Sequence, residues 1–402
     1  VPRRRRSSST TSEQSSSSSS SEDDQSVSVQ IERNQQSSSR RPIHPLAEQT
    51  SSSCSSSSSS SLIHNVLSNC FIGICEPFQT RVDQSIRLTT TMTDHHTSSS
   101  SSSPFAYQQF SNLAKIHNVL EFYYRTIGKL MQHQGKFVKT LMQLKDSALE
   151  LFFQSVNHAI RQLEIDPPLP SSHDLVAPRE LVSIVHKLNE ILIDFSQSLS
   201  MVLEDARDVQ ARLIPIIECF VDPLLRVCSL SATKLSTSPL HTTVFLINCL
   251  QLIESTVAPH LHQNCAKLEL VKAQQDNHLS ALIDLATSYF VDKIAFGSCY
   301  QHYQAYCKQD ENQPLSTVKG LDAQSLSKAL REFEKIMFEI ETTRIDGVYQ
   351  LNCSSQRDQT RTKVITNLLQ AYGELYQQVI DPVNNYNEPT SIVRYSPQQL
   401  YA

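Results

Sequence analysis

Two groups of histidine and cysteine residues have side chains of the types that bind zinc. They are His260, His262 and Cys265, followed by Cys299, His302 and Cys307. A structural zinc site needs four ligands, and neither group has an obvious fourth. Cys299 and Cys307 fall on helical turns among aromatic residues, where a buried free thiol is common. We therefore expect ordinary packing or surface positions for both groups, and we predict no metal site and no cofactor.

The nearest approach to a phosphate-binding loop runs from Gly128 to Gly135 and Lys136. Its two glycines are seven residues apart, and Phe137 takes the place of the hydroxyl that would bind magnesium. For covalent catalysis, the sequence contains no Gly-x-Ser-x-Gly elbow and no recognisable set of cysteine, histidine and carboxylate. We therefore predict that the chain has no catalytic residues and is not an enzyme.

Charged residues gather in two places. Three carboxylates lie close together in the sequence, at Glu204, Asp205 and Asp208. Arg207 and Arg212 lie beside them, which favours a solvated helix face with ion pairs over a carboxylate site. The run from Arg3 to Arg6 could bind polyanions or serve nuclear import, although a tail without a defined role is the simpler interpretation. A formal net charge of -5 makes nucleic acid a poor default partner.

The composition favours helices over sheets. Only 7 glycines, no tryptophan and 39% hydrophobic residues suit a helical core, because sheets and phosphate loops use glycine at their turns. No apolar run reaches the roughly 20 residues that a membrane-spanning helix needs. The 10 cysteines are scattered rather than densely spaced, which is typical of a reducing, cytosolic setting.

Changes in composition divide the chain into three predicted parts. Residues 1–61 are polyserine broken by charges and are expected to be disordered, because they cannot bury a core. Residues 62–110 hold a short helical island, from Leu62 to Leu88, and a second serine run. Residues 111–402 show the spacing of a helical-bundle domain.

The strongest helical pattern covers residues 113–163, where apolar residues recur at steps of three and four. Ser111 is the expected N-cap of this stripe. The segment Asp166-Pro167-Pro168 should end it, because proline lacks the amide donor and disfavours helix in the preceding residue. Gly128 and Gly135 are expected to bend or split the helix.

Later segments repeat this pattern. Further helices are predicted at about 178–202, 246–258, 261–306, 322–345 and 360–380. Pro215 and Pro223 are expected to interrupt the stretch after the first of these. Each apolar stripe needs a neighbour to cover it, so the sequence predicts an all-α fold of antiparallel bundles stacked end to end in an elongated rod.

Two packing predictions follow from particular residues. Phe152 lies on the apolar stripe and is expected to face the core. The tail from Asp381 to Ala402 contains several prolines, and its large apolar side chains include Val383, Tyr386, Ile392, Val393, Tyr395 and Leu400. Such a segment is expected to pack back on the 360–380 helix rather than remain a free end.

Several short segments are similar to a known family. The C-terminal ones are Ala371-Tyr372-Gly373-Glu374-Leu375-Tyr376, Val379-Ile380-Asp381-Pro382, Asn385-Tyr386, Glu388-Pro389 and Ser396-Pro397-Gln398-Gln399. Upstream blocks are Leu120-Glu121-Phe122-Tyr123 and Val221-Asp222-Pro223-Leu224-Leu225, with weaker similarity at Cys75-Glu76-Pro77 and Leu282-Ile283-Asp284. In this order, from about Leu62 to Ala402, they resemble subunit six of the conserved oligomeric Golgi complex.

The resemblance implies a non-catalytic subunit of a vesicle tether, peripheral on the cytosolic face of Golgi membranes and needed for intra-Golgi retrograde transport. It implies helical rods, and as partners the other subunits of the complex, SNARE proteins, small GTPases and golgins, with no nucleic acid. The resemblance also implies an N-terminal half with a coiled-coil region, and we interpret the polyserine as standing in its place. Two alternatives stay open: a related helical tether at another membrane, and a nuclear or RNA-associated protein with an arginine- and serine-rich tail.

Overall fold

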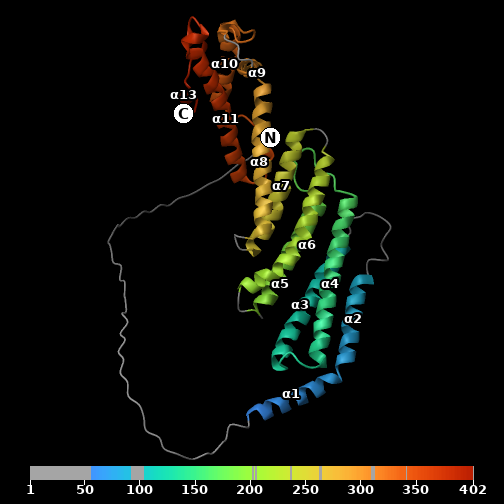
Figure 1. The fold of residues 1–402 in the computed structure, drawn as a ribbon. Coiled ribbons are helices and arrows are strands. Elements are labelled where there is room, and N and C mark those ends of the chain that lie inside the picture. The colour runs from blue at the N-terminus through green and yellow to red at the C-terminus, as the bar shows by residue number, and fades with distance from the viewer. Residues whose placement is uncertain are drawn as a thin grey trace, which may run out of the picture. The chain divides into compact units, whose positions relative to one another are not determined.

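The computed structural model describes residues 56–91, 104–201, 203, 206–235, 238–261, 265–308, 313–340 and 342–401. Within these ranges every regular element is a helix, which confirms the predicted all-α class (Figure 1). Most of the segment predicted to be disordered, residues 1–61, lies outside the described residues, as does the serine run at 98–103. From Ser56 onward the chain is already helical.

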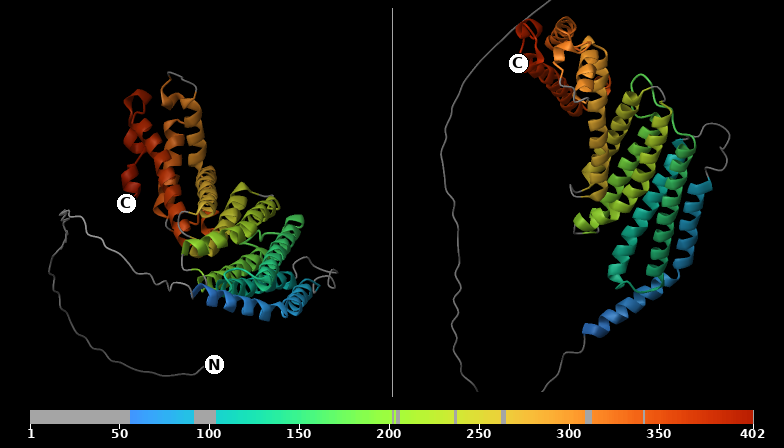
Figure 2. Two further views of the ribbon diagram at one scale, coloured as in Figure 1. Left: turned by 60° about the horizontal axis from the view of Figure 1, so that its bottom comes forward. Right: turned by 45° about the horizontal axis from the view of Figure 1, so that its top comes forward.

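The helices form two bundles that share one long helix. The first bundle contains α1 (Ser56–Ile72), α2 (Cys75–Thr91), α3 (Pro104–Leu130), α4 (Lys136–Ile165), α5 (Arg179–Ser200), α6 (Ala206–Thr233) and α7 (Pro239–Val257). The second contains α8 (Ala266–Asp292), α9 (Ala295–Cys307), α10 (Ala323–Phe338) and α11 (Ser354–Ile380). Because α8 packs against both α7 and α11, it joins the two bundles (Figure 2).

Short helices complete the chain. The 3-10 helices are η1 (Ala258–His260), η2 (Leu315–Thr317), η3 (Val348–Gln350) and η4 (Pro382–Asn384), and the last two α-helices are α12 (Pro389–Ile392) and α13 (Pro397–Tyr401). At the other end, the segment predicted as a helical island forms α1 and α2, which both pack on α4. Phe71 of α1 stacks on Phe137 of α4 with 5.0 Å between ring centroids. Apolar contact therefore ties this segment to the first bundle, and the division of the chain into domains at residue 110 stays a prediction.

The long apolar stripe at 113–163 forms two helices, α3 and α4, which turn back on each other through a tight loop (Figure 1). Gly128 stays within α3, whereas Gly135 has a φ of 106°, which residues with a Cβ rarely adopt. The predicted split near the glycines is therefore confirmed. The prediction that Ser111 caps the helix is wrong, because α3 begins at Pro104 and Ser111 is buried within it.

Prolines end one helix and lie inside another. As predicted, α4 ends at Ile165, just before Pro167 and Pro168. The prediction that Pro215 and Pro223 interrupt the chain is wrong, because both lie inside α6. A proline in a helix interior costs about 3 kcal/mol, and the burial of a long apolar face of α6 offsets this cost. The buried face includes Ile216, Ile217, Phe220, Val221, Leu224 and Val227.

A cluster of aromatic rings lies at the centre of the first bundle. Phe152 of α4 is completely buried, and its ring centroid lies 6.2 Å from that of Phe195 in α5 and 6.4 Å from that of Phe220 in α6. Two rings of α3 complete the cluster, since Phe110 lies 5.8 Å from Phe220 and His117 lies 5.7 Å from Phe195. The inward position of Phe152 is thus confirmed, and the rings connect four helices.

The stretch predicted as one helical pattern, 261–306, contains two helices. The chain leaves α8 at Asp292 and starts α9 at Ala295. A Cβ placed on Gly297 would lie 2.4 Å from the backbone oxygen of Val291. Only glycine therefore permits so close an approach between the start of α9 and the end of α8.

A second aromatic cluster holds α9, α10 and α11 together. The ring centroid of Phe333 in α10 lies 4.5 Å from that of Phe296 in α9 and 5.3 Å from that of Tyr372 in α11. Tyr372 is completely buried, and its Oη lies 3.1 Å from Glu334 Oε1 and 2.7 Å from the backbone oxygen of Tyr395. One hydroxyl therefore connects α11 both to α10 and to the tail.

The tail packs on α11, as predicted, through its last two helices and η4. Its buried apolar residues are Tyr386, Ile392, Val393 and Leu400. The Tyr386 hydroxyl donates a hydrogen bond to the backbone oxygen of Leu321 at 2.7 Å. Val383 and Tyr395 remain exposed, so these two apolar side chains of the tail do not face the core.

Replacement of Phe152 by aspartate should destabilise the first bundle. The charge would lie among three aromatic rings without a partner, so we expect a loss of about 3 kcal/mol or more in the free energy of unfolding. Chemical denaturation followed by circular dichroism measures this loss. Met142→Asp, on the exposed side of the same helix, is the matched control and should change stability little. Equal effects of the two substitutions would contradict the inward packing of Phe152.

Removal of residues 385–402 should loosen α11. The deletion would expose the apolar face around Leu375 and Val379, so we expect a loss of about 3 kcal/mol or more in stability. Hydrogen exchange should then become faster across residues 360–380. The exposed Val383→Asp serves as a control that leaves exchange unchanged. Fast exchange of residues 392–400 in the intact chain would show that the tail is not packed.

Candidate functional site

The first group of predicted zinc-type side chains is not assembled as a site in the described residues. His260 Nε2 lies 3.2 Å from Asn189 Oδ1 of α5, and burial lowers the pKa of this histidine. Cys265 is buried just before α8, while His262 lies outside the described residues. Among the described side chains, no three histidines, cysteines or carboxylates meet in an arrangement that could hold a metal ion.

The second group lies on α9, where each side chain has a different environment. Cys299 Sγ donates to the backbone oxygen of Gly320 at 3.5 Å, and burial raises the pKa of this thiol. His302 Nδ1 donates to the backbone oxygen of Ser298 at 2.6 Å. Cys307 is exposed. Cys299 is thus held by the loop before α10, and His302 by its own helix.

The remaining candidate sites are distributed over helix ends. The loop between Gly128 and Gly135 reverses the chain, and Lys136 is the first residue of α4. Asp208 lies in the first turn of α6, whereas Glu204 and Asp205 lie outside the described residues, as do Arg3 to Arg6.

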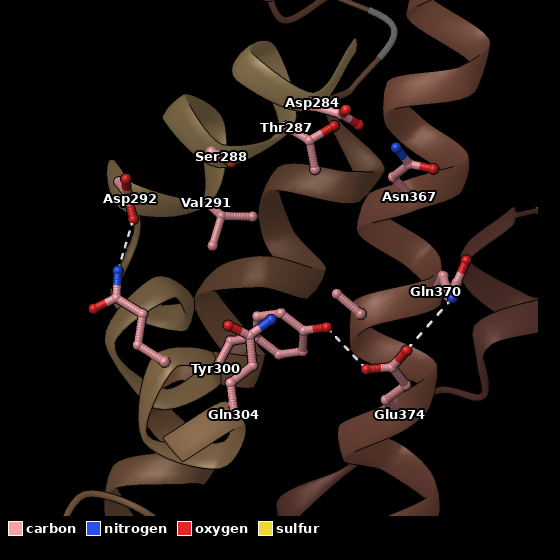
Figure 3. A pocket seen from close by; sticks show the side chains of 12 residues that line it. Asp284, Thr287, Ser288, Val291, Asp292, Tyr300, Gln304, Asn367, Gln370 and Glu374 are labelled. Carbon is pink, nitrogen blue, oxygen red and sulfur yellow. Dashed lines mark hydrogen bonds between the residues drawn. The ribbon is translucent and has the colours of Figure 1, made fainter. Parts of the chain in front are cut away.

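A polar hollow of 430 Å³ lies between α8, α9 and α11 (Figure 3). It contains three carboxylates, and two of them are held by neutral donors. Tyr300 Oη donates to Glu374 Oε2 at 2.8 Å, and Gln301 Nε2 donates to Asp292 Oδ1 at 3.0 Å. Asp284 is the third carboxylate of the lining. The hollow is acidic, and its acidic groups are largely engaged with neighbouring side chains.

A larger hollow, of 600 Å³, lies between α3 and α5, and we call it the α3/α5 groove. Its lining consists of Lys115, Asn118, Val119, Phe122, Tyr123, Asp194, Gln197, Ser198 and Met201. A hollow of 270 Å³ extends it along α3 to Lys129 and Leu130. The exposed fractions of its large apolar side chains are high, at 78% for Met201, 63% for Leu130 and 55% for Val119. Neighbouring exposed apolar side chains of this kind mark an interaction surface more often than scattered ones do.

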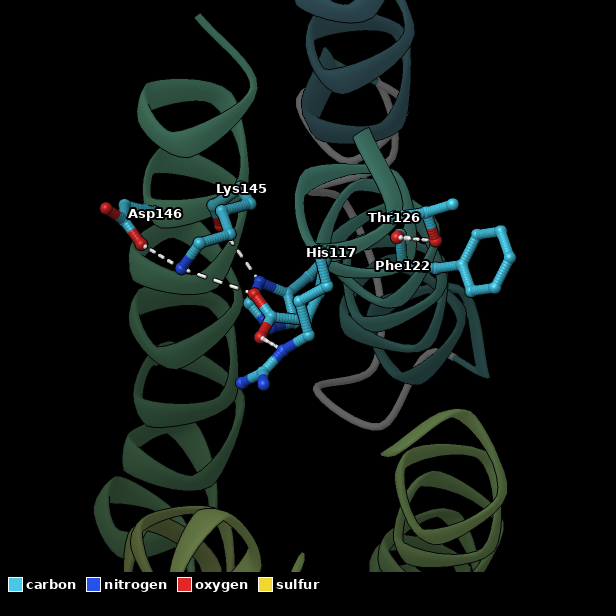
Figure 4. A network of polar contacts seen from close by, with 7 residues as sticks. His117, Phe122, Thr126, Lys145 and Asp146 are labelled. Atoms are coloured by element: carbon cyan, nitrogen blue, oxygen red, sulfur yellow. Dashed lines mark hydrogen bonds and ion pairs between the residues drawn. The ribbon is translucent and has the colours of Figure 1, made fainter. Parts of the chain in front are cut away.

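The opposite side of α3 is anchored to α4 by a buried polar network (Figure 4). Arg125 Nε lies 2.6 Å from Glu121 Oε1, and Lys145 Nζ lies 3.3 Å from Glu121 Oε2. His117 Nδ1 donates to the backbone oxygen of Lys145 at 2.9 Å. Phe122 points away from this network (Figure 4), and it is one of the residues that line the groove. One face of α3 is therefore fixed to α4 by ion pairs and a hydrogen bond, and its other face is accessible to another protein.

Burial and charge set the protonation of the network. Burial disfavours the ionised form of Glu121, but its hydrogen bond from Arg125 and the charge of Lys145 together lower the pKa of this carboxyl. Burial lowers the pKa of His117, and the hydrogen bond to Lys145 only partly offsets this effect. The imidazole of His117 stacks on Phe195 with an angle of 20° between the rings. The same residue thus connects α3 to α4 and to α5, beneath the groove.

Sequence reasoning missed this groove. Tyr123 and Leu130 fall on the three-and-four spacing of the 113–163 stripe, which predicts that they face the core. This prediction is wrong, because both are exposed. Val119 and Phe122 are the other apolar residues on that side of α3. One feature of the sequence could have indicated the groove. The α3 segment has more apolar residues than one buried face of a helix can hold.

Comparison with known proteins gives one consistent result. The family model described as Conserved Oligomeric Golgi complex subunit 6, C-terminal, matches residues 21–402. Conserved oligomeric Golgi complex subunit 6 of Dictyostelium discoideum and that of Homo sapiens are each 27% identical to the chain, over 84% of the chain and 47% of the relative. The Arabidopsis thaliana protein of the same name is 24% identical over 83% of the chain and 50% of the relative. The chain spans about half the length of the curated relatives it matches.

The His117 contacts predict a dependence of stability on pH. Because the pKa of His117 is lowered from its ordinary value of 6.5 in the folded state, the unfolded chain binds the proton more readily. The free energy of unfolding should therefore fall as the pH is lowered from about 7.5 to about 5.5. Denaturant titrations at both pH values measure this fall.

Two substitutions test whether His117 causes this dependence of stability on pH. His117→Phe keeps the ring stack on Phe195 but cannot be protonated, so its stability should depend less on pH than that of the natural chain. His158→Gln, at an exposed position of α4, is the control for the removal of a histidine as such. An unaltered slope in His117→Phe would show that His117 is not the responsible group.

Proposed function

The chain belongs to the conserved oligomeric Golgi complex subunit 6 family, and on this premise we propose that it acts as a non-catalytic scaffold in intra-Golgi retrograde vesicle transport. The observation that carries the proposal is the family match, which covers residues 21–402. Its partners in this role are the other subunits of the Golgi complex.

The structure supports a scaffold in two ways. Two helical bundles with aromatic centres provide a rigid support, and the α3/α5 groove offers apolar side chains for contact with another protein. The groove has the composition of an interface, because aromatic and methionine side chains are enriched in such surfaces. A scaffold that makes several weak contacts of this kind gains avidity when the contacts are made together.

The cellular setting is also part of the proposal. We place the chain on the cytosolic face of Golgi membranes as a peripheral protein, with SNARE proteins, small GTPases and golgins as further partners. Among the described residues, no helix has both the length and the apolar character needed to cross a membrane. Attachment to the Golgi would then come through the other subunits of the complex.

Affinity purification tests this proposal. We expect a tagged chain to recover the other subunits of the Golgi complex and to localise to the Golgi, and we expect the same result after deletion of residues 1–55. The Phe152→Asp variant should recover much less, because a destabilised bundle cannot hold its partners. Recovery of the subunits of a plasma-membrane tether, or nuclear localisation that depends on residues 1–55, would contradict the proposal.

A further inference from the structure

The α3 wall of the groove has an apolar centre and a cation at each end. Val119, Phe122 and Tyr123 lie between Lys115 and Lys129, and at 3.6 residues per turn all five fall within about 120° on one side of α3. The two lysines are 14 residues apart in the numbering, which corresponds to about 21 Å along a helix. This length suits about four turns of a second helix laid beside α3.

The α5 wall is different in character. Asp194, Gln197 and Ser198 recur at helical spacing and present polar side chains to the groove. Met201 follows one turn later and is the apolar residue of this wall. A segment in the groove therefore meets apolar side chains on one side and hydrogen-bonding groups on the other. An amphipathic helix has this same division between its two faces.

We propose that the α3/α5 groove binds one amphipathic helix of a partner protein that carries acidic residues at both ends of its apolar stripe. This proposal adds a binding mode to the proposed scaffold function. It rests on that function only for the place in the cell where the chain meets its partner. The binding mode is a helix laid in a groove between two helices, as the third member of a local bundle.

Charge favours an acidic partner. Within the described part of the chain, neither Lys115 nor Lys129 forms an ion pair, and the nearby Glu190 is already bound by Lys187 at 2.5 Å. Arg125 lines the extension of the groove, but its guanidinium is engaged with Glu121. Lys115 and Lys129 therefore place positive charge at both ends of the apolar row, and Asp194 is the one carboxylate among the lining residues. Carboxylates at the ends of the partner helix would complement the two lysines.

A helix fits this surface better than a strand or a bilayer. A strand would need an unpaired sheet edge, and the backbone amides of α3 and α5 are already used within their helices. A bilayer surface would meet Met201 and Val119 but would also bury the polar α5 wall against lipid. The concave shape and the two unlike walls thus select a rod-shaped, two-faced ligand.

The two helices that form the groove are held in place before a partner arrives. His117 contacts Phe195 of α5 and the backbone of Lys145 in α4, so α3 and α5 keep a fixed relation. Lys145 and Arg125 hold Glu121 on the buried side of α3. A preformed groove loses less conformational entropy on binding, which favours affinity.

Two synthetic helices of about 18 residues test the proposal, cross-linked to hold their helical form. Both carry leucines at i, i+4, i+7 and i+11, and one has glutamates at both ends where the other has lysines. Fluorescence anisotropy measures their binding to the full chain. We expect the acidic peptide to bind about ten-fold more tightly than the basic one.

Substitutions in the groove make the test specific. Phe122→Asp should weaken the binding of the acidic peptide by about ten-fold or more, as expected for loss of an aromatic anchor. The double variant Lys115→Glu and Lys129→Glu should prefer the basic peptide. Val182→Asp changes a similarly exposed residue of α5 outside the groove and should bind like the natural chain. Circular dichroism checks that every variant retains its fold.

Several results would overturn the proposal. These are equal binding of the two peptides, unchanged binding by Phe122→Asp, self-association of the chain that Phe122→Asp abolishes, or binding to phosphatidylcholine vesicles that depends on Phe122. The scaffold function is tested separately. If peptide binding fails but the chain still recovers the other Golgi subunits, only the groove proposal is wrong. If peptides bind as expected and no subunits are recovered, only the scaffold proposal is wrong.

Discussion

The contacts of the Phe152 ring determine how the first bundle is assembled. Phe152 of α4 touches Phe195 of α5 and Phe220 of α6, and each of these rings touches a residue of α3. Four helices thus pack around one aromatic centre, and each helix covers the apolar stripe of its neighbours. The same centre explains how α6 accommodates two internal prolines, because the burial of its apolar face outweighs the hydrogen bonds that proline removes.

The position of α3 follows from this centre and makes the groove possible. The Phe110 and His117 rings hold α3 from the core side, and the buried ion pairs of Glu121 hold it against α4. With that side occupied, the apolar residues on the remaining side of α3 have only α5 as a partial neighbour. The groove is therefore the part of an amphipathic helix that its own bundle does not cover.

The C-terminal segments that resemble the Golgi family have a physical role in the second bundle. Tyr372 connects α11 to Glu334 in α10 and to the backbone of Tyr395 in the tail. Gly373 lies against Pro397, because a Cβ at this glycine would be 3.5 Å from the Cγ of that proline. The family segment around Tyr372 and Gly373 therefore packs against the family segment around Pro397 in the second bundle.

The sequence by itself determined the helical class, the inward position of Phe152, the end of α4 at its prolines and the packed tail. These features depend on local spacing and on the chemistry of single residues, which are present in the sequence. The tertiary structure decided that Pro215 and Pro223 remain inside α6, that α3 starts before Ser111, and that Tyr123 and Leu130 stay exposed. An apolar side chain is covered only if a neighbouring helix reaches it, and neighbours are set by contacts between residues far apart in the chain. For that reason the helices could be predicted from the sequence, whereas the α3/α5 groove could not.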